Sequence, residues 1–170
     1  MKRILALDLG THTGVAFNSA NGVGFWAETK AWATDEEVTR NGKSRLDRRC
    51  DPRITRFFDY LKTFEAEADI VVFEDVLFAS SRMQAHLWAS FRTAVWLAFP
   101  DTLIECVPTG TLKKFACNGG ATKDQMSLAL KRKFPMYWKA KYDDNAIDAI
   151  WLWLWADKNL SRTPLTKQTP

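Results

Sequence analysis

Short apolar runs bounded by turn residues recur along the chain, and they predict five β-strands. Gly, Asn, Asp or Pro flanks these runs, and such residues favour turns. The first three runs follow one another closely, and Asn21-Gly22 before the third is a two-residue hairpin signal, so they predict an antiparallel meander. The predicted strands span residues 4–9, 13–18, 23–29, 69–74 and 103–107.

Longer segments have apolar residues three and four positions apart, which is the spacing of an amphipathic helix. The predicted helices span residues 52–66, 83–98, 109–116, 122–134 and 144–157. Strands before and between helices are typical of a mixed α/β sheet with helices on both faces. We therefore expect one α/β domain over residues 1–157 and a loosely ordered tail over residues 158–170, where apolar residues are few.

Composition narrows the class of protein. The 170 residues are 46% hydrophobic and 26% charged, as in a globular domain. No apolar run approaches the ~20 residues needed to cross a bilayer, and the short N-terminal run ends at Asp8, unlike a signal peptide. Three cysteines without a CxxC pair, and two histidines, argue against a disulfide framework and a zinc site. We expect a cytoplasmic protein with no membrane partner.

Basic residues are concentrated in two segments, although the net charge is only +4. Residues 110–141 contain eight Lys and Arg against one acid, and residues 40–56 contain seven against two. Such segments predict positive patches that bind a polyanion, or they are ordinary solvated helix faces. The basic residues of the first segment are Arg40, Lys43, Arg45, Arg48, Arg49, Arg53 and Arg56.

Four acidic residues are placed where the predicted elements bring them to one edge of the sheet. Asp8 and Glu74 each end a predicted strand, while Asp144 and Asp148 are four residues apart and share a helix face. Carboxylates gathered in this way repel one another unless a cation lies between them. Ligands of this kind suit Mg²⁺ or Mn²⁺, and two ions about 4 Å apart can hold both oxygens of a phosphoryl displacement.

Each acid also has a structural interpretation. Asp8 could organise a turn, Glu74 could lie on a strand rim, and Asp144 could be a helix N-cap. Asp148 favours function most strongly, because it lies inside the apolar run AIDAIWLWLW, where an unpartnered carboxylate is costly. The neighbouring acids Asp75 and Asp143 are expected to be exposed.

Four segments, in this order, carry a resemblance to a known family: ILALDLGTHTGVAF, VVFEDVLFASSRMQAHLWASFRTAVW, VPTGTLKKFACNGGATKDQM and DDNAIDAIWL. Together they span most of residues 1–157. The chain resembles the RuvC-type Holliday junction resolvases, a group of the ribonuclease H-like nucleases, and most of all their shorter bacteriophage members.

The resemblance implies a ribonuclease H-like fold with three antiparallel and then two parallel strands. It implies a homodimer that cuts branched DNA at symmetric positions, with two Mg²⁺ ions in each active site, Mn²⁺ as a substitute and no organic cofactor. The expected products carry a 5′-phosphate and a 3′-hydroxyl. By position, Asp8, Glu74 and Asp148 would be metal ligands, Lys123 would lie near the scissile phosphate, and Lys113 would share that role.

Two positions depart from the family pattern. Asn145 stands where cellular members have the first acid of the closing helix, whereas the Asp-Asp-Asn sequence of the phage variant favours Asp144. The spacing from Lys113 to Lys123 is one residue short, so Lys114 is an alternative to Lys113.

Further residues are candidates for contacts with DNA. Arg45, Arg48 and Arg49 would bind the DNA backbone. Phe78 would wedge against bases at the junction centre or pack in the core. For the lysines, the alternative is ordinary surface exposure.

Other functions compete with junction resolution. The same fold could cut a flap or an RNA-containing substrate, or could bind DNA structures without cutting them. An actin-like sugar kinase or ATPase shares the Asp-Leu-Gly opening, but it needs two such domains, and 170 residues are too few.

The helix over residues 83–98 is expected to form the dimer interface, because it is apolar over more than one sheet face can cover. The side with Leu87, Phe91, Ala94 and Ala98 would meet the partner. Alternatively, the Trp-rich final helix, with Trp151, Trp153 and Trp155, covers this surface within one subunit.

Overall fold

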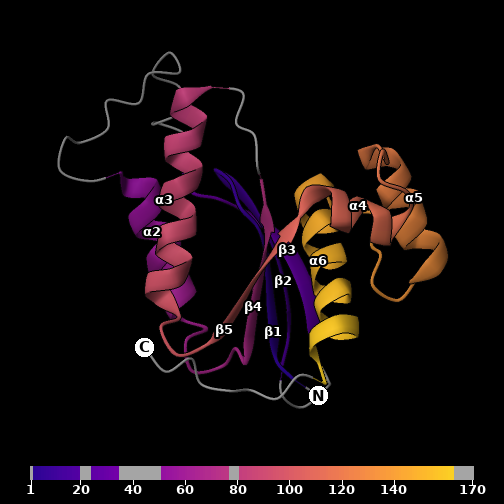
Figure 1. Ribbon diagram of the computed structural model, residues 1–170, viewed down its shortest axis with the longest axis horizontal. Coiled ribbons are helices and arrows are strands. Elements are labelled where there is room, and N and C mark those ends of the chain that lie inside the picture. Colours follow the sequence, from indigo (N-terminus) through magenta and orange to yellow (C-terminus); the bar gives the residue numbers. More distant parts are fainter. Residues whose placement is uncertain (1, 20–23, 35–50, 77–80, 163–170) are drawn as a thin grey trace.

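The structure, a computed structural model, describes residues 2–19, 24–34, 51–76 and 81–162 (Figure 1). Five strands form one mixed sheet in the order β3-β2-β1-β4-β5. β1, β2 and β3 are antiparallel neighbours, and β4 and β5 run parallel to β1. The strands are β1 (Ile4–Asp8), β2 (His12–Asn18), β3 (Phe25–Ala31), β4 (Ile70–Asp75) and β5 (Leu103–Pro108). The predicted mixed sheet with helices on both faces is confirmed.

Five helices cover the sheet within the described residues: α2 (Pro52–Lys62), α3 (Arg82–Ala98), α4 (Thr109–Ala116), α5 (Lys123–Lys133) and α6 (Asp144–Leu160). Figure 1 shows α2 and α3 on one side of the sheet and α6 on the other, with α4 and α5 beyond α6. The sheet thus separates two apolar cores.

Strand alternation decides which residues enter each core. Leu7 of β1 and Phe73 of β4 belong to the core beneath α2 and α3, whereas Ala6 and Val72 belong to the core beneath α6. Because successive side chains of a strand point to opposite faces, the next residues, Asp8 and Glu74, fall on the α6 side. Both faces of β1 and β4 are covered, which explains their continuous apolar runs.

Helix α6 is buried nearly all round. Its buried residues include Trp151 and Trp153, and the helix lies between the sheet and the α4–α5 pair. The Trp151 indole donates a hydrogen bond to the Met126 carbonyl of α5 at 3.1 Å. A helix that is apolar on all sides requires such a position. It extends three residues beyond the predicted end, to Leu160, and residues 163–170 of the predicted tail lie outside the described residues.

The side of α3 that was expected to meet a partner needs correction, while a dimer interface on α3 stays a prediction. Phe91, Ala94 and Ala98, expected at a dimer interface, are buried against α2 and the sheet of the same chain. The alternative prediction, that the Trp-rich helix covers the apolar surface of α3, is also wrong, because α6 packs on the opposite face of the sheet. The exposed apolar residues of α3 are Met83, Trp96 and Leu97.

Element boundaries differ slightly from the prediction. The third strand lies two residues further along, at Phe25–Ala31, and its hairpin signal Asn21-Gly22 lies outside the described residues. Helix α2 ends at Lys62, and turns follow it. Within the described part of the chain, none of the helices combines the length and apolar character that crossing a membrane demands.

Candidate active site

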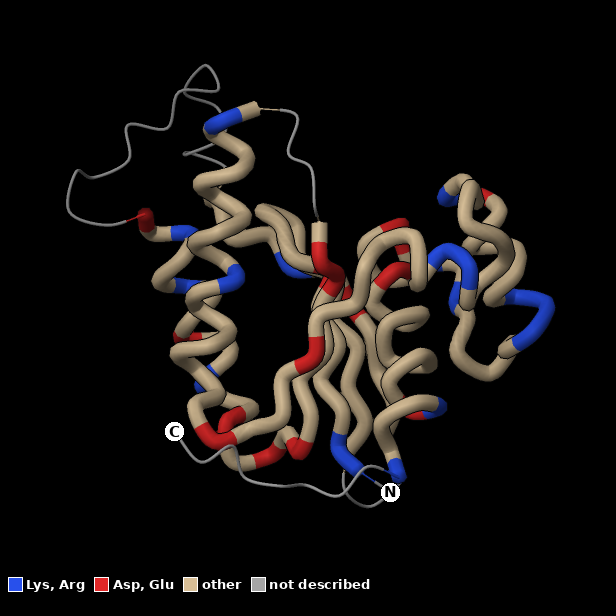
Figure 2. The backbone as a smooth tube through the Cα atoms, in the orientation of Figure 1, with Lys and Arg blue, Asp and Glu red and all other residues tan. Residues whose placement is uncertain are grey.

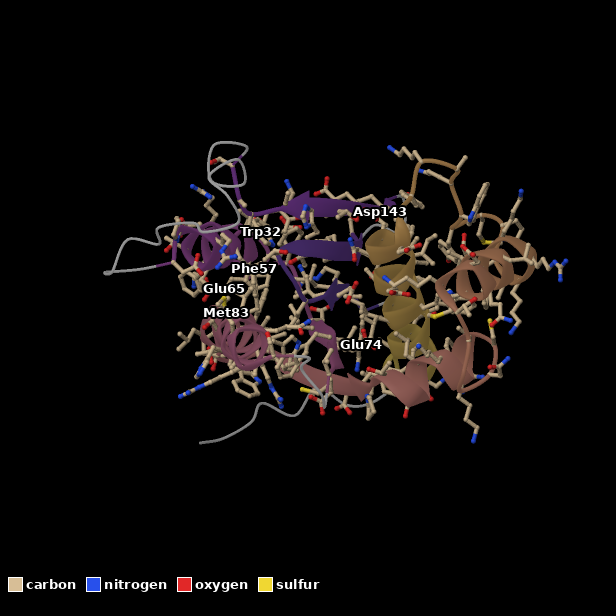
Figure 3. All side chains as sticks on the ribbon, turned by 90° about the horizontal axis from the view of Figure 1, so that it is seen from above. Trp32, Phe57, Glu65, Glu74, Met83 and Asp143 are labelled. Atoms are coloured by element: carbon tan, nitrogen blue, oxygen red, sulfur yellow. The ribbon has the colours of Figure 1, made fainter. Side chains whose placement is uncertain are left out.

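The parallel pairing of β1 and β4 brings Asp8 and Glu74 together. Leu7 is the register partner of Phe73, so the residues that follow them, the last of β1 and the last but one of β4, lie at the same edge. Figure 3 looks down on this edge and shows Glu74 between the sheet and α6. Two carboxylates that are 66 positions apart in sequence therefore meet at the carboxyl edge of the sheet.

The turn after Asp8 is fixed by a buried threonine. The Thr13 hydroxyl donates to the Gly10 carbonyl at 2.7 Å and accepts a hydrogen bond from the Trp32 indole at 2.7 Å. Thr13 is fully buried, so its contact with the Trp32 indole is shielded from water, whereas the contact with Gly10 is partly buried. This turn holds the end of β1, and with it Asp8, in one position.

Helix α6 reaches the same edge through a close approach to β2. Gly14, the register partner of Asp8, packs so tightly that a Cβ there would lie 1.9 Å from the Asn145 carbonyl oxygen. Asp143 caps the helix by accepting a hydrogen bond from the Ala146 amide at 3.0 Å, and it also accepts one from the Thr29 hydroxyl of β3. The first turn of α6 is therefore held directly beside Asp8.

A buried asparagine holds the other end of α6. The Asn18 side-chain oxygen accepts hydrogen bonds from the Trp153 indole and the Ile4 amide, each at 2.8 Å. Its amide group donates to the Lys2 carbonyl at 2.9 Å. The helix is thus attached to β1 and β2 at two separate heights.

One cavity of about 490 Å³ collects five of the six catalytic residues that the sequence predicts. Asp8, Glu74 and Asp148 line it together with Lys113 and Lys123. Asp144 and Lys114 are exposed and are not among the lining residues. Asn145 lines the cavity, as do Leu9, Gly10, Thr11, His12 and Thr109.

Lys123, the first residue of α5, faces two acids of α6. Its ammonium nitrogen lies 3.7 Å from Asp148 Oδ2 and 3.8 Å from Asp144 Oδ2. The Asp144 side chain is 55% exposed, whereas that of Asp148 is 15% exposed. The N-cap of α6 is Asp143, so the interpretation of Asp144 as the cap is wrong.

The acids are electrostatically strained. Burial raises the pKa of Asp8 well above its usual range, and the carboxylates of Asp148 and Glu74 raise it further, while Lys123 lowers it. The pKa of Asp148 rises to about 6, again mainly by burial, with Lys123 opposing and Glu74 adding to the rise. Such strain identifies a place where positive charge is favoured.

The donor set fits a hard divalent cation. Among the residues that the structure describes, no three acidic, His or Cys side chains come close enough to hold one ion in this arrangement. Mg²⁺, however, keeps several waters and is bound by one or two carboxylates at a time. Asp8, Glu74 and Asp148 share a cavity and offer only oxygen donors, so the chemistry of the site suits Mg²⁺ or Mn²⁺.

Several residues near the site escaped the sequence analysis. His12 and Thr109 line the cavity from the start of β2 and of α4. Position alone could have suggested His12, which follows the turn after Asp8. Asp75 was expected to be exposed, but its side chain is 22% exposed and pairs with Arg92 of α3.

Four of the expected DNA contacts, Arg45, Arg48, Arg49 and Phe78, lie outside the described residues. The second basic segment is described. Figure 2 shows Lys and Arg along the α4–α5 arm and acids where β4 ends and α6 begins. A basic arm therefore flanks an acidic site.

The fold is shared with solved structures of resolvases. T. thermophilus RuvC in complex with Holliday junction substrate matches with a TM-score of 0.69 at 14% identity, over 98% of this chain and 99% of that one. A second T. thermophilus RuvC structure gives a TM-score of 0.61 at 15% identity, over 88% and 90% of the two chains. The yeast mitochondrial Holliday junction resolvase Ydc2 gives 0.57 at 9% identity, over 89% and 75%.

The chain therefore has the ribonuclease H-like fold of these proteins, and the resemblance seen in the sequence is confirmed at the level of the fold. No protein-family model and no curated protein sequence matches the chain. At such low identity, the activity has to be argued from the site itself.

Proposed function

We propose that this protein is a metal-dependent endonuclease that resolves four-way or otherwise branched DNA junctions. The observation that carries the proposal is the cavity in which Asp8, Glu74 and Asp148, from three different elements, meet Lys113 and Lys123. Strained carboxylates next to lysines form a site for cations and phosphate together. The structural neighbour in complex with Holliday junction substrate points to the class of DNA.

In this proposal, Asp8, Glu74 and Asp148 hold two Mg²⁺ ions, with either Asp144 or Asn145 as the fourth ligand. Asn145 has the advantage of lining the cavity. When bound, two divalent cations activate the attacking water and stabilise the leaving 3′-oxygen, which gives a 5′-phosphate and a 3′-hydroxyl.

The lysines act on the phosphate. Lys123 lies within 4 Å of two carboxylates and is 58% exposed, so it would offset the charge that builds on the non-bridging oxygens of a bound phosphate. Lys113 lines the same cavity, whereas Lys114 is exposed on the α4–α5 arm and is better placed for the DNA backbone. The arm itself would follow a duplex through phosphate contacts.

A homodimer would supply the two active sites that paired cuts require. The surface that suits a second copy is the α2–α3 groove of about 550 Å³, lined by residues such as Ile54, Phe58 and Ala89. Leu97, 65% exposed, lies in it. We expect Leu97→Glu to give monomers in light scattering and Leu128→Glu, on exposed α5, to leave dimers. Dimers of both variants would place the interface elsewhere.

Cleavage of a labelled four-way junction, with Mg²⁺ or with EDTA, tests the proposed function. A linear duplex, a flap and an RNA–DNA hybrid of matched sequence are assayed beside it, with Asp8→Asn as the inactive control. We expect metal-dependent cleavage of the junction alone. Preferred cleavage of the hybrid or the flap would show that the protein is a nuclease for that substrate instead. Junction binding without any cleavage would show that it is a non-catalytic DNA-structure-binding protein.

A further inference from the structure

The last two residues of β4 have different partners. Glu74 points to the α6 side and lines the catalytic cavity, while Asp75 points to the α3 side, as strand alternation requires. There the Arg92 guanidinium donates a hydrogen bond to Asp75 Oδ1 at 3.2 Å. The residue next to a proposed metal ligand is thus attached to a helix on the opposite face of the sheet.

Arg92 is itself held on several sides. Trp88 lies about one helical turn before Arg92 in α3, and Trp96 lies about one turn after it. The guanidinium carbon of Arg92 is 5.2 Å from the ring centre of Trp88 and 4.7 Å from that of Trp96. It lies 5.8 Å from the Phe73 ring, and it donates to Cys106 Sγ at 3.9 Å. Cation–π contacts of this kind fix an arginine in one orientation.

Keeping an arginine at this position is costly. Its Nε is buried and has no hydrogen-bond partner among the described residues. An unsatisfied buried donor destabilises the folded chain, and an apolar side chain of similar length would avoid this cost. The arrangement therefore favours a role for Arg92 beyond stabilising the fold.

We propose that Arg92 is a positioning residue for the catalytic site: by holding Asp75, it fixes the end of β4 so that Glu74 faces Asp8 and Asp148. The inference rests on the proposed function, because it assumes that these acids bind divalent cations. β5 pairs with this end of β4 only through Val107 and Pro108, and proline has no amide hydrogen to donate. The Arg92–Asp75 pair supplies a side-chain attachment where the ladder weakens.

The test measures Mn²⁺ binding to the DNA-free protein by electron paramagnetic resonance, with Asp8→Asn to identify the site. Arg92→Met and Asp75→Asn each remove the pair. We expect each to raise the Mn²⁺ dissociation constant about tenfold, the lower end of the loss seen when groups that orient metal ligands are removed. In junction cleavage, the Mg²⁺ concentration for half-maximal rate should rise about tenfold as well, with the rate largely restored at saturating Mg²⁺.

The double variant Arg92→Met/Asp75→Asn separates a shared role from two independent ones. If the residues act as one pair, the double variant should also weaken Mn²⁺ binding only about tenfold, not about a hundredfold. Arg92→Lys keeps the charge but loses the planar fork, and it should lie between wild type and Arg92→Met. If Arg92→Met does not fold, Asp75→Asn tests the same pair from the other side.

Arg3→Met is the matched control, because Arg3 pairs with Asp69 just before the other end of β4, at 2.7 Å. It should lower the melting temperature without changing the affinity for Mn²⁺. Unchanged Mn²⁺ affinity in Asp75→Asn, or an equal change in Arg3→Met, would overturn the positioning role. Absence of Mn²⁺ binding by the wild type would overturn it too, whereas Mn²⁺ binding without junction cleavage would overturn only the proposed function.

Discussion

The two ends of β1 and β4 carry charged residues with opposite consequences. Just before the amino end, Arg3 donates hydrogen bonds to Asp69 from its guanidinium and from its backbone amide, at 2.7 and 2.8 Å. The Arg3 side chain thereby lowers the pKa of Asp69. At the carboxyl end, burial and neighbouring acids raise the pKa of Asp8.

The difference separates stability from function along the same two strands. The amino end is a satisfied ion pair that favours the folded chain. The carboxyl end gathers carboxylates that the fold alone does not neutralise, with Lys123 as a partial counter-charge. A site that costs stability persists because satisfied contacts elsewhere, such as those of Asn18, offset the cost.

The largest expected effect comes from removing one acid at the carboxyl end. Asp8→Asn should lower junction cleavage on the order of a thousandfold or more, because a charged carboxylate ligand is replaced by a neutral and weaker one. Junction affinity should stay the same or rise, since one repulsion toward phosphate disappears. Asp69→Asn, at the other end, should keep its cleavage rate. Cleavage by Asp8→Asn near the wild-type rate would refute the assignment of this cavity as the catalytic site.

A second change alters the geometry of the carboxyl end and leaves its charge intact. Gly14→Ala places a methyl group within 1.9 Å of the Asn145 carbonyl, so the first turn of α6 must move. We expect a loss of about 1–3 kcal/mol in stability from overpacking, and a fall in cleavage of about tenfold to a hundredfold. Thermal unfolding and single-turnover cleavage measure the two effects. A neutral Gly14→Ala would mean that α6 is free to shift.

The third prediction compares the stability of the two ends across pH. Asp148 has a folded-state pKa of about 6, above the value of about 3.9 for an unfolded chain. Between these values the folded state binds more protons, so this carboxyl costs stability as the pH rises through 6. Asp148→Asn should therefore stabilise the metal-free protein by up to about 3 kcal/mol at pH 7.5, and the gain should vanish toward pH 4.

Asp69→Asn should behave in the opposite way. Because the pKa of Asp69 is lowered in the folded state, its contribution is present near neutral pH and is lost as the pH falls through that value. Urea unfolding of both variants in EDTA, at pH 7.5 and pH 4.5, measures the difference. Destabilisation by Asp148→Asn at pH 7.5 would show that the acids at the carboxyl end are not strained.

The smallest expected effect concerns the two basic segments of the chain. Each phosphate contact adds about 0.9 to the slope of log K against log salt. Arg48→Ala/Arg49→Ala should lower the slope for junction binding by about 2 and leave the product ends unchanged. The same double change in Lys131 and Lys133 of α5 tests the described arm. If only the change in α5 lowers the slope, the DNA-binding surface lies on α4 and α5 and does not include Arg48 and Arg49.

Much of this comparison could be predicted from the sequence. Buried parallel strands are continuous apolar runs, so residues 4–9 and 69–74 were assigned nearly at their observed bounds. The carboxyl ends of parallel neighbours meet at one edge, so the sequence alone predicts that Asp8 and Glu74 lie together. Asp148 was found because a carboxylate inside an apolar helix needs a reason to be there.

The errors have a common physical origin in helix rotation. One residue turns a helix by about 100°, and helix ends are uncertain by one or two residues, so sequence alone could not choose between Asp143 and Asp144 as the cap. For the same reason, the sequence alone could not decide which of the adjacent residues Lys113 and Lys114 faces the cavity. For α3, which is apolar on several sides, only the packing of α2 decides which side is covered. Arg92 was missed because its partner, Asp75, lies 17 residues away.

The position of α6 in the chain has a consequence for protein synthesis. Each strand that the structure describes precedes α6, so a ribosome exposes Asp8 and Glu74 before it makes Asp148. Until α6 emerges, one face of the sheet lacks its Trp151 and Trp153 cover, and the cavity lacks a wall. Completion of the second core and completion of the acidic cavity are thus a single event. In the proposed nuclease, we expect a chain that ends before α6 to be inactive, because it lacks Asp148.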